Sequence, residues 1–252
     1  MTLLIDADWL LYAACSACEY DIRWDEWIHT LHLEQSDAKS YMTHQVNRWQ
    51  EATGHKDVVM CLSSYPTFRH QLSPEYKANR VGRRKPLGLR DMRAWLESEY
   101  DVRCHQNLEA DDVMGILMTN GMYQDPIMVT ADKDMRTVPG KLLRMDKMEI
   151  NDVGDANRNW MTQALVGDTS DNYPGLKGFG PVKAEKLLAE HHTLPAMWSA
   201  VVEAYRKGGE TFGAALLNAR MARILRYGDY DFTAATVELW DPDRDPAMKI
   251  NG

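Results

Sequence analysis

Apolar runs and helical repeats alternate along the first half of the chain. Leu3-Leu4-Ile5 is a short apolar run, and Asp57–Leu62 and Ile127–Thr130 are two further ones. Continuous apolar runs of this length are typical of strands that are buried on both faces. Between them, four segments repeat apolar positions at helical spacing: residues 9–17, 37–52, 88–100 and 111–120. Strands that alternate with helices predict an α/β fold whose parallel sheet is flanked by helices.

After about residue 160 the pattern becomes helical, and helices are expected as far as about residue 232. Residues 235–240 indicate a last strand, which would return to the sheet or cover one of its edges. We therefore expect a sheet core at 1–158, a helical region packed on it at 159–240, and a tail at 241–252 that is a frayed end.

Composition places the chain among globular proteins, with 44% hydrophobic and 26% charged residues in 252. No apolar run is long enough to span a bilayer, and the first residues lack the features of a signal peptide. Four cysteines do not suggest a disulfide framework, and Cys15 and Cys18 are expected to pack in an apolar helix. A cytoplasmic monomer without a membrane partner is the expectation.

The net charge of −8 argues against a general nucleic-acid coat, but the basic residues are concentrated. Between residues 69 and 93, only Glu75 and Asp91 oppose a run of eight basic side chains: Arg69, Lys77, Arg80, Arg83, Arg84, Lys85, Arg90 and Arg93. Tyr65, Phe68 and Tyr76 lie in or beside this run. Although a solvated loop would also be basic, the interleaved aromatic residues favour a nucleic-acid-binding segment.

Acidic residues gather where an α/β sheet places its ligands, at the carboxyl ends of strands or at the helix starts that follow. Four clusters have this position: Asp6 and Asp8; Glu109, Asp111 and Asp112; Asp132 and Asp134; and Asp168 and Asp171. Each cluster alone could cap a helix or form a turn. Together they would repel one another unless cations neutralised them, and Mg²⁺ or Mn²⁺ prefers such oxygen ligands.

The fourth cluster adjoins a second signal. Asp168 and Asp171 have a spacing that puts both carboxylates on one side of a helical turn. Seven residues later come Gly178-Phe179-Gly180 and then Pro181, which reads as the first residue of a helix. Glycines at a helix start let a phosphate approach the free backbone N–H groups closely. An acidic metal site beside a phosphate clamp indicates chemistry on a nucleic-acid backbone.

Five segments together resemble the 5′-nuclease superfamily of flap endonucleases and 5′→3′ exonucleases. They are 4–8 (LIDAD), 68–80 (FRHQLSPEYKANR), 108–115 (LEADDVMG), 130–134 (TADKD) and 167–181 (GDTSDNYPGLKGFGP). Near the end, MARILR at 221–226 and ELW at 238–240 further resemble the small exonucleases of short-tailed bacteriophages. The resemblance implies a PIN-like core with a basic helical arch at 65–86 and a helix–hairpin–helix (H3TH) element at 160–190 that grips duplex DNA.

The resemblance also implies roles for single residues. Asp6, Glu109, Asp111 and Asp132 would ligate a first metal ion; Asp134, Asp168 and Asp171 would hold a second, and Asp112 would adjoin both. Lys77 would contact the scissile phosphate with Arg80, and Tyr76 would stack on a base. Further DNA contacts would come from the basic run and the hairpin: Arg69, Arg83, Arg84, Lys85, Gly178, Phe179, Gly180 and Lys183. Backbone carbonyls of the hairpin could hold K⁺.

One departure concerns the segment after the second strand, where the family usually has an aspartate. Here Ser63 or Ser64 takes its place, which should weaken the first metal site, although Asp8 could partly compensate. The expected function is metal-dependent hydrolysis of DNA at 5′ ends or flaps, with RNA–DNA hybrids as a further substrate. Two alternatives remain: a phosphatase with Asp6 as nucleophile and Asp8 as general acid, and a DNA-structure-binding protein with a degenerate site.

Overall fold

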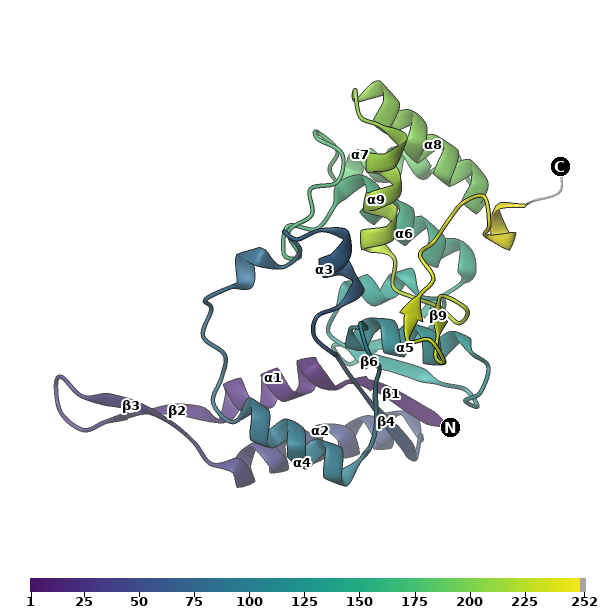
Figure 1. The fold of residues 1–252 in the computed structure, drawn as a ribbon. Helices are drawn as coiled ribbons and strands as arrows, with labels where there is room; N and C mark the ends of the chain where they lie inside the picture. The colour runs from purple at the N-terminus through teal and green to yellow at the C-terminus, as the bar shows by residue number, and fades with distance from the viewer. Residues whose placement is uncertain (250–252) are drawn as a thin grey trace.

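A six-stranded sheet forms the centre of the protein in this computed structural model, which describes residues 1–249 (Figure 1). Across the sheet the strands are β5 (Asp101–Cys104), β4 (Asp57–Leu62), β1 (Thr2–Asp6), β6 (Ile127–Thr130), β7 (Gly140–Arg144) and β8 (Lys147–Asn151). All neighbours pair in parallel except β7 and β8, which are antiparallel. The predicted α/β class, with a mostly parallel sheet and one mixed edge, is confirmed.

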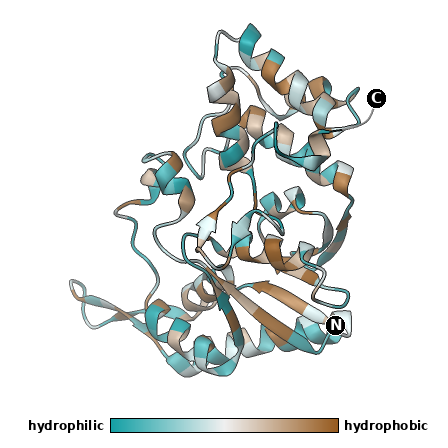
Figure 2. Cartoon of the chain, turned by 45° about the vertical axis from the view of Figure 1, so that its right-hand side comes forward, coloured by the Kyte–Doolittle hydropathy of each residue, from teal (hydrophilic) through white to brown (hydrophobic). Residues whose placement is uncertain are grey.

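Helices cover both faces of this sheet, which explains why the strand sequences are continuously apolar (Figure 2). In β1, Leu3 and Ile5 point to one face and Leu4 points to the other, and all three are fully buried. The first face packs against α1 (Ala7–Cys18), α2 (Gln35–Thr53) and α4 (Leu89–Glu99). The second packs against α5 (Ala110–Thr119). Cys15 is buried in α1, as expected.

A group of helices lies at one end of the molecule and has a core of its own. Its members are α6 (Val153–Val166), α7 (Pro181–Leu188), α8 (Leu194–Lys207) and α9 (Phe212–Ala222). The Trp240 ring packs edge-on against Trp160 and Trp198, with centroids 4.8 and 4.9 Å away. No helix within residues 1–249 is both long and apolar enough to cross a membrane.

The expectation of a frayed tail is wrong for residues 241–249. The indole of Trp240 donates a hydrogen bond to Asp245 at 2.7 Å, and Met248, in the short helix η3 (Pro246–Met248), packs against the helical core. The tail therefore folds back, because a buried tryptophan N–H needs an acceptor and Asp245 supplies it. Residues 250–252 lie outside the described part of the chain.

Two features of the structure differ from the pattern-based expectation. Residues 235–240 do not join the main sheet; only β10 (Thr236–Val237) is a strand, and it pairs with β9 (Tyr230–Asp231) over the α5 face. Strands β2 (Glu19–Arg23) and β3 (His29–Leu33) form a separate hairpin that projects from the body (Figure 1). Most of its side chains are exposed and none is fully buried, so it lacks the burial pattern from which a core strand is recognised.

Short elements connect the sheet core and the helical group. After β4 the chain forms α3 (Phe68–Leu72) and the 3₁₀ turn η1 (Ala78–Arg80), and after β6 it forms the 3₁₀ turn η2 (Lys133–Thr137). The segment from η1 to α4 runs from the helical group back to the sheet core (Figure 1).

Arg69 of α3 ties these parts together inside the protein. Its guanidinium donates to both carboxylate oxygens of Asp112 at 2.7 and 2.9 Å and to Glu109 at 2.8 Å. It also donates to the carbonyl groups of Met221 and Arg223 at the end of α9. Arg69 is 3% exposed and Asp112 is fully buried. Arg69 borders a cavity lined by carboxylates, but its guanidinium donors are taken up by these contacts, and Asp112 does not line that cavity. Neither side chain is therefore free, as placed, for the predicted contact with DNA or with a metal ion.

Substituting Arg69→Met should lower the free energy of unfolding by about 3–5 kcal/mol, because the buried Asp112 carboxylate would lose its counter-ion. Chemical denaturation measures this effect. Arg206→Met is the matched control, since its pair with Glu203 is solvent-exposed and screened by water, so its loss should change the stability little. Adding Asp112→Leu to Arg69→Met should restore part of the stability, and equal losses in the two arginine variants would contradict the assignment.

Candidate active site

Eight carboxylates line one cavity of about 310 Å³ at the carboxyl edge of β1 and β6. They are Asp6, Asp8, Glu109, Asp111, Asp132, Asp134, Asp168 and Asp171. The chain leaves β1 toward β4 on one side and later returns to β6 on the other, so this edge is the switch point where open α/β sheets bind ligands. The structure thus brings together seven of the eight predicted metal ligands, all except Asp112, and adds Asp8.

Local backbone geometry fixes the carboxylates on the sheet side. Asp6 ends β1 and caps α1: its Oδ1 accepts from the Trp9 amide at 3.0 Å, and its Oδ2 accepts from the Thr130 hydroxyl at 2.8 Å. Asp132 caps η2 by accepting from the Asp134 amide at 2.8 Å. These short caps place both carboxylates at strand ends without any contact to a basic group.

A tight turn between α6 and α7 supplies the carboxylates of the opposite wall. Asp168 Oδ1 accepts from the amides of Ser170 and Asp171 at 2.6 and 3.2 Å, so the pair lies in a turn rather than in the expected helical turn. Gly167 and Gly175 close its base at positive φ, and a Cβ on either would come within 2.4 Å of the other's amide nitrogen. Only glycine fits both positions. The turn is therefore built to hold Asp168 and Asp171 at the cavity.

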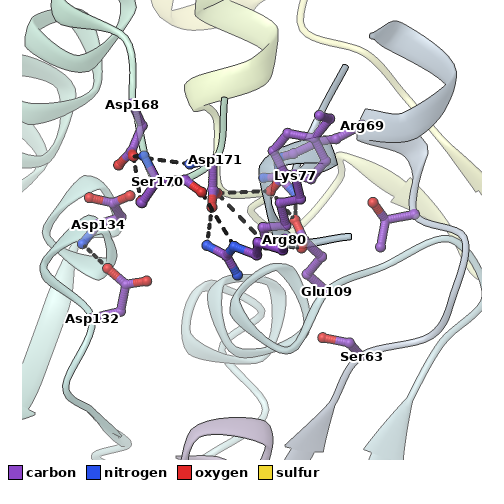
Figure 3. A network of polar contacts seen from close by, with 12 residues as sticks. Ser63, Arg69, Lys77, Arg80, Glu109, Asp132, Asp134, Asp168, Ser170 and Asp171 are labelled. Atoms are coloured by element: carbon purple, nitrogen blue, oxygen red, sulfur yellow. Dashed lines mark hydrogen bonds and ion pairs between the residues drawn. The ribbon is translucent and has the colours of Figure 1, made fainter. Parts of the chain in front are cut away.

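Two cations from the segment around η1 occupy the middle of the site (Figure 3). Lys77 Nζ pairs with Glu109 Oε1 and lies 3.7 Å from Asp171 Oδ2. Arg80 Nη2 pairs with Asp171 Oδ1 at 2.5 Å. The predicted catalytic residues Lys77, Arg80 and Asp132 thus line a single cavity. Lys77 and Arg80 are on its Glu109–Asp171 side, and Figure 3 shows Asp132 and Asp134 away from them.

Tyr76 lies beneath these cations and is 3% exposed. Its hydroxyl donates toward Glu109 Oε2 at 2.8 Å and Asp171 Oδ2 at 3.0 Å. As placed, the Tyr76 ring is enclosed in the helical core and presents no free face to a DNA base. The ring instead links a carboxylate of the sheet core to one of the α6–α7 turn.

The charge balance divides the site into two halves. Burial, with repulsion from neighbouring carboxylates, raises the pKa of Asp6 to about 6 and of Asp134 to about 7. The pKa of Asp111 is raised well above its usual value for the same reasons. Burial would raise the pKa of Glu109 as well, but the charges of Arg69 and Lys77 lower it to about 2. The half with Asp6, Asp111 and Asp134 thus holds more carboxyl groups than the nearby cations can neutralise.

This half suits a hard divalent cation by its donor chemistry. Its ligands are carboxylate oxygens, and the buried Gln163 Oε1 on the cavity wall has no hydrogen-bond partner. Over residues 1–249, however, no three acidic, histidine or cysteine side chains converge closely enough to hold an ion as placed. The donor set fits a cation, and its carboxylates would have to move toward it.

The remaining predicted DNA contacts lie on the surface, on two sides of this site. Arg83, Arg84 and Lys85 are exposed, and Arg84 forms a two-pronged pair with Glu19 of β2 at 2.5 and 2.7 Å. At the start of α7, a Cβ on Gly178 or Gly180 would meet open space. Lys183 lies over the Phe179 ring, 4.0 Å from its centroid. The predicted helix start at Pro181 is confirmed.

Asp8, Ser63 and Gln163 also line the cavity, although none of them is among the predicted metal ligands. Asp8 Oδ2 accepts from the Ser63 amide at 2.9 Å, and Ser63 Oγ accepts from the Ala110 amide at 2.9 Å. Ser64 instead turns its hydroxyl to the Leu108 carbonyl, so Ser63 is the residue that faces the carboxylates. Gln163 has no sequence signal, since an amide side chain on a helix usually faces solvent.

Comparison with known proteins agrees with this geometry. The family model described as "5′-3′ exonuclease, N-terminal resolvase-like domain" matches residues 1–164. The chain belongs to the 5′-3′ exonuclease family. It is 25% identical to the exonuclease of Escherichia phage T7 over 95% of this chain and 93% of that protein. It is also 25% identical to the exodeoxyribonuclease of Enterobacteria phage T3, over 95% and 92% of the two chains.

A solved structure gives the fold. The bacteriophage T5 flap endonuclease, in a complex with DNA and metal ions, superimposes with a TM-score of 0.65 and covers 88% of each chain at 14% identity. The predicted family, with its likeness to phage exonucleases, is confirmed, and so is the enzyme class of a 5′→3′ exonuclease or flap endonuclease.

The raised pKa of Asp134 makes stability depend on pH. Between its usual value of 3.8 and about 7, the folded protein holds a proton that the unfolded chain has lost, so stability falls as pH rises through this range. Asp134→Asn should therefore melt at a higher temperature than the parent protein at pH 8 in EDTA, and the difference should shrink toward pH 4. Glu51→Gln, at an exposed site on α2, is the control. If the difference in melting temperature between Asp134→Asn and the parent protein stays the same from pH 4 to pH 8, the charge assignment is contradicted.

Proposed function

We propose that the protein is a divalent-metal-dependent 5′→3′ exonuclease that hydrolyses DNA phosphodiester bonds with two ions and also cuts 5′ flaps. The observation that supports this most is the single cavity lined by eight carboxylates, five of them without an ion-pair partner among the described residues, beside an exposed basic segment. A polyanionic substrate would be repelled from such a cavity unless cations bound there first.

Mg²⁺ or Mn²⁺ would be held by Asp6, Asp111 and Asp132 on the sheet side and by Asp134, Asp168 and Asp171 on the turn side, with Glu109 between them. Bound ions would supply the positive charge that activates a water and stabilises the leaving oxygen. Among the structural relatives, the T5 proteins were solved with metal ions, including zinc. Lys77 and Arg80 would then balance the charge of the scissile phosphate.

DNA recognition would use surfaces on both sides of the cavity. The segment 65–86, with Arg83, Arg84 and Lys85, would act as a basic arch over the 5′ end. The α6–α7 connection would act as the H3TH element, where Gly178, Phe179, Gly180 and Lys183 contact duplex phosphates, aided by K⁺. Backbone contacts of this kind do not read base sequence, so position relative to a 5′ end would choose the bond. RNA–DNA hybrids would fit the same surfaces.

Two alternatives make different predictions in one experiment, a time course on 5′-flap, nicked and blunt duplexes labelled at each end. A phosphatase would cleave a chromogenic phosphomonoester and leave these duplexes intact. Its nucleophile would be Asp6, but both Asp6 oxygens already accept hydrogen bonds, from Trp9 and Thr130. A protein with a degenerate site would bind the duplexes without cutting them in Mg²⁺ or Mn²⁺. Release of 5′-terminal nucleotides or flaps supports the proposal.

Asp132→Ala and Asp168→Ala should each reduce cleavage by at least about 100-fold, because each removes a ligand of a catalytic ion. Binding of a 5′-flap duplex, measured by fluorescence anisotropy in Ca²⁺, should remain. Asp146→Ala, in the β7–β8 turn and outside the cavity, is the control and should cleave normally. Turnover retained in either site variant would refute the ligand assignment.

The position of Ser63 makes a second test of the metal site. Ser63→Asp adds a carboxylate where the side chain faces the cavity, so half-saturation of cleavage by Mg²⁺ should occur at a lower concentration, by about threefold or more. Ser64→Asp is the matched control, since Ser64 points to the Leu108 carbonyl and does not line the cavity. The same metal response in both variants would show that Ser63 has no part in metal binding.

A further inference from the structure

The segment that carries Lys77 and Arg80 is docked on the turn that carries Asp168 and Asp171. The Lys77 amide donates to the Asp171 carbonyl at 3.0 Å, and the Asn172 side chain donates to the Glu75 carbonyl at 2.7 Å. Asn79 and Arg80 also donate to carbonyl groups of this turn. These contacts join residues about 90 positions apart in sequence, so the two cations are brought to the carboxylates by a specific interface.

At this interface each carboxylate oxygen of Glu109 and Asp171 lies within hydrogen-bond distance of a donor, and Glu109 Oε2 and Asp171 Oδ2 share the single hydroxyl proton of Tyr76. Lys77 contacts Glu109 Oε1, and Arg69 and Tyr76 donate to Glu109 Oε2. Arg80 pairs with Asp171 Oδ1, and Tyr76 donates to Asp171 Oδ2. Carboxylate lone pairs used in such contacts are not free for a metal ion. A divalent cation that approaches Glu109 or Asp171 therefore competes with Lys77 or Arg80 for the same oxygens and repels the paired positive charge.

We propose that Lys77 and Arg80 form a displaceable latch: they compete with a divalent cation for Glu109 and Asp171, and the cation releases them. The inference rests on the proposed metal-dependent function. Because a cation on Glu109 frees Lys77 and a cation on Asp171 frees Arg80, metal binding prepares the phosphate contacts of the same site. Binding of the metal and of the DNA phosphate then assist one another, since coupling between two ligands is reciprocal.

Lys133 provides a control that separates the latch from general charge repulsion. It lines the same cavity, and its charge acts on Asp134 and Asp168 without an ion pair at contact distance among the described residues. Removing either lysine makes the cavity more negative by one charge. Only removal of Lys77 also frees a carboxylate oxygen that is already occupied.

Calorimetric titration with Mg²⁺ in the absence of DNA measures the competition. Lys77→Met should bind Mg²⁺ at least about fivefold more tightly than the parent protein, and Lys133→Met should change the affinity by less than about twofold. Arg80→Met is the second latch variant; its side chain is 47% exposed, so it should fold even if Lys77→Met does not. Equal gains in the Lys77 and Lys133 variants, or no gain in either latch variant, would overturn the latch.

The reactivity of the Lys77 amine gives a readout that needs no variant. In the parent protein, mild acetylation followed by peptide mass spectrometry should label Lys77 slowly without metal and several-fold faster in Ca²⁺ or Mg²⁺. Lys207, exposed on α8, should react at the same rate in both conditions. Unchanged labelling of Lys77 in saturating Mg²⁺ overturns the latch. If the parent and all variants bind no divalent ion, the proposed metal site fails as well; if they bind it equally, only the latch fails.

Discussion

The mutual repulsion of eight carboxylates around one cavity is the constraint to which the rest of the structure responds. Carboxylates this close cannot all be charged in a protein interior without counter-ions. The structure meets this constraint in two ways. Arg69 and Lys77 lower the pKa of Glu109, and Lys77 and Arg80 partly offset the effect of burial at Asp171, whereas Asp6, Asp111 and Asp134 hold their protons to higher pH. Bound divalent cations would take the place of the protons on Asp6, Asp111 and Asp134.

The same constraint explains how the sheet core and the helical group are joined. The carboxylates come from both parts, so the buried contacts between the parts are ionic as well as apolar. Arg69 connects Asp112 of α5 with the end of α9, and Tyr76 connects Glu109 with Asp171. A change in the charge of the site must therefore act on the relative position of the two parts.

Much of this arrangement follows from the sequence, because strands buried on both faces have a distinctive apolar pattern. The ends of β1 and β6 could be located from Leu3-Leu4-Ile5 and Ile127–Thr130, and with them the positions of Asp6 and Asp132. Parallel strands bring such ends to one edge of the sheet, so the acidic cluster followed without coordinates. The β2–β3 hairpin could not be predicted from the sequence, because its side chains alternate between two solvated faces and leave no burial pattern.

What the sequence could not supply is the direction in which neighbouring polar side chains point. Asp111 and Asp112 are adjacent in the first turn of α5, where consecutive residues differ by about 100° around the helix axis. One therefore lines the cavity, and the other is buried against Arg69. The charges of Arg69 and Lys77 are likewise equivalent in the sequence, but Arg69 is buried and held by several hydrogen bonds, while Lys77 is partly exposed in the cavity. A basic run thus contains both a structural counter-ion and displaceable ones, and only their burial distinguishes them.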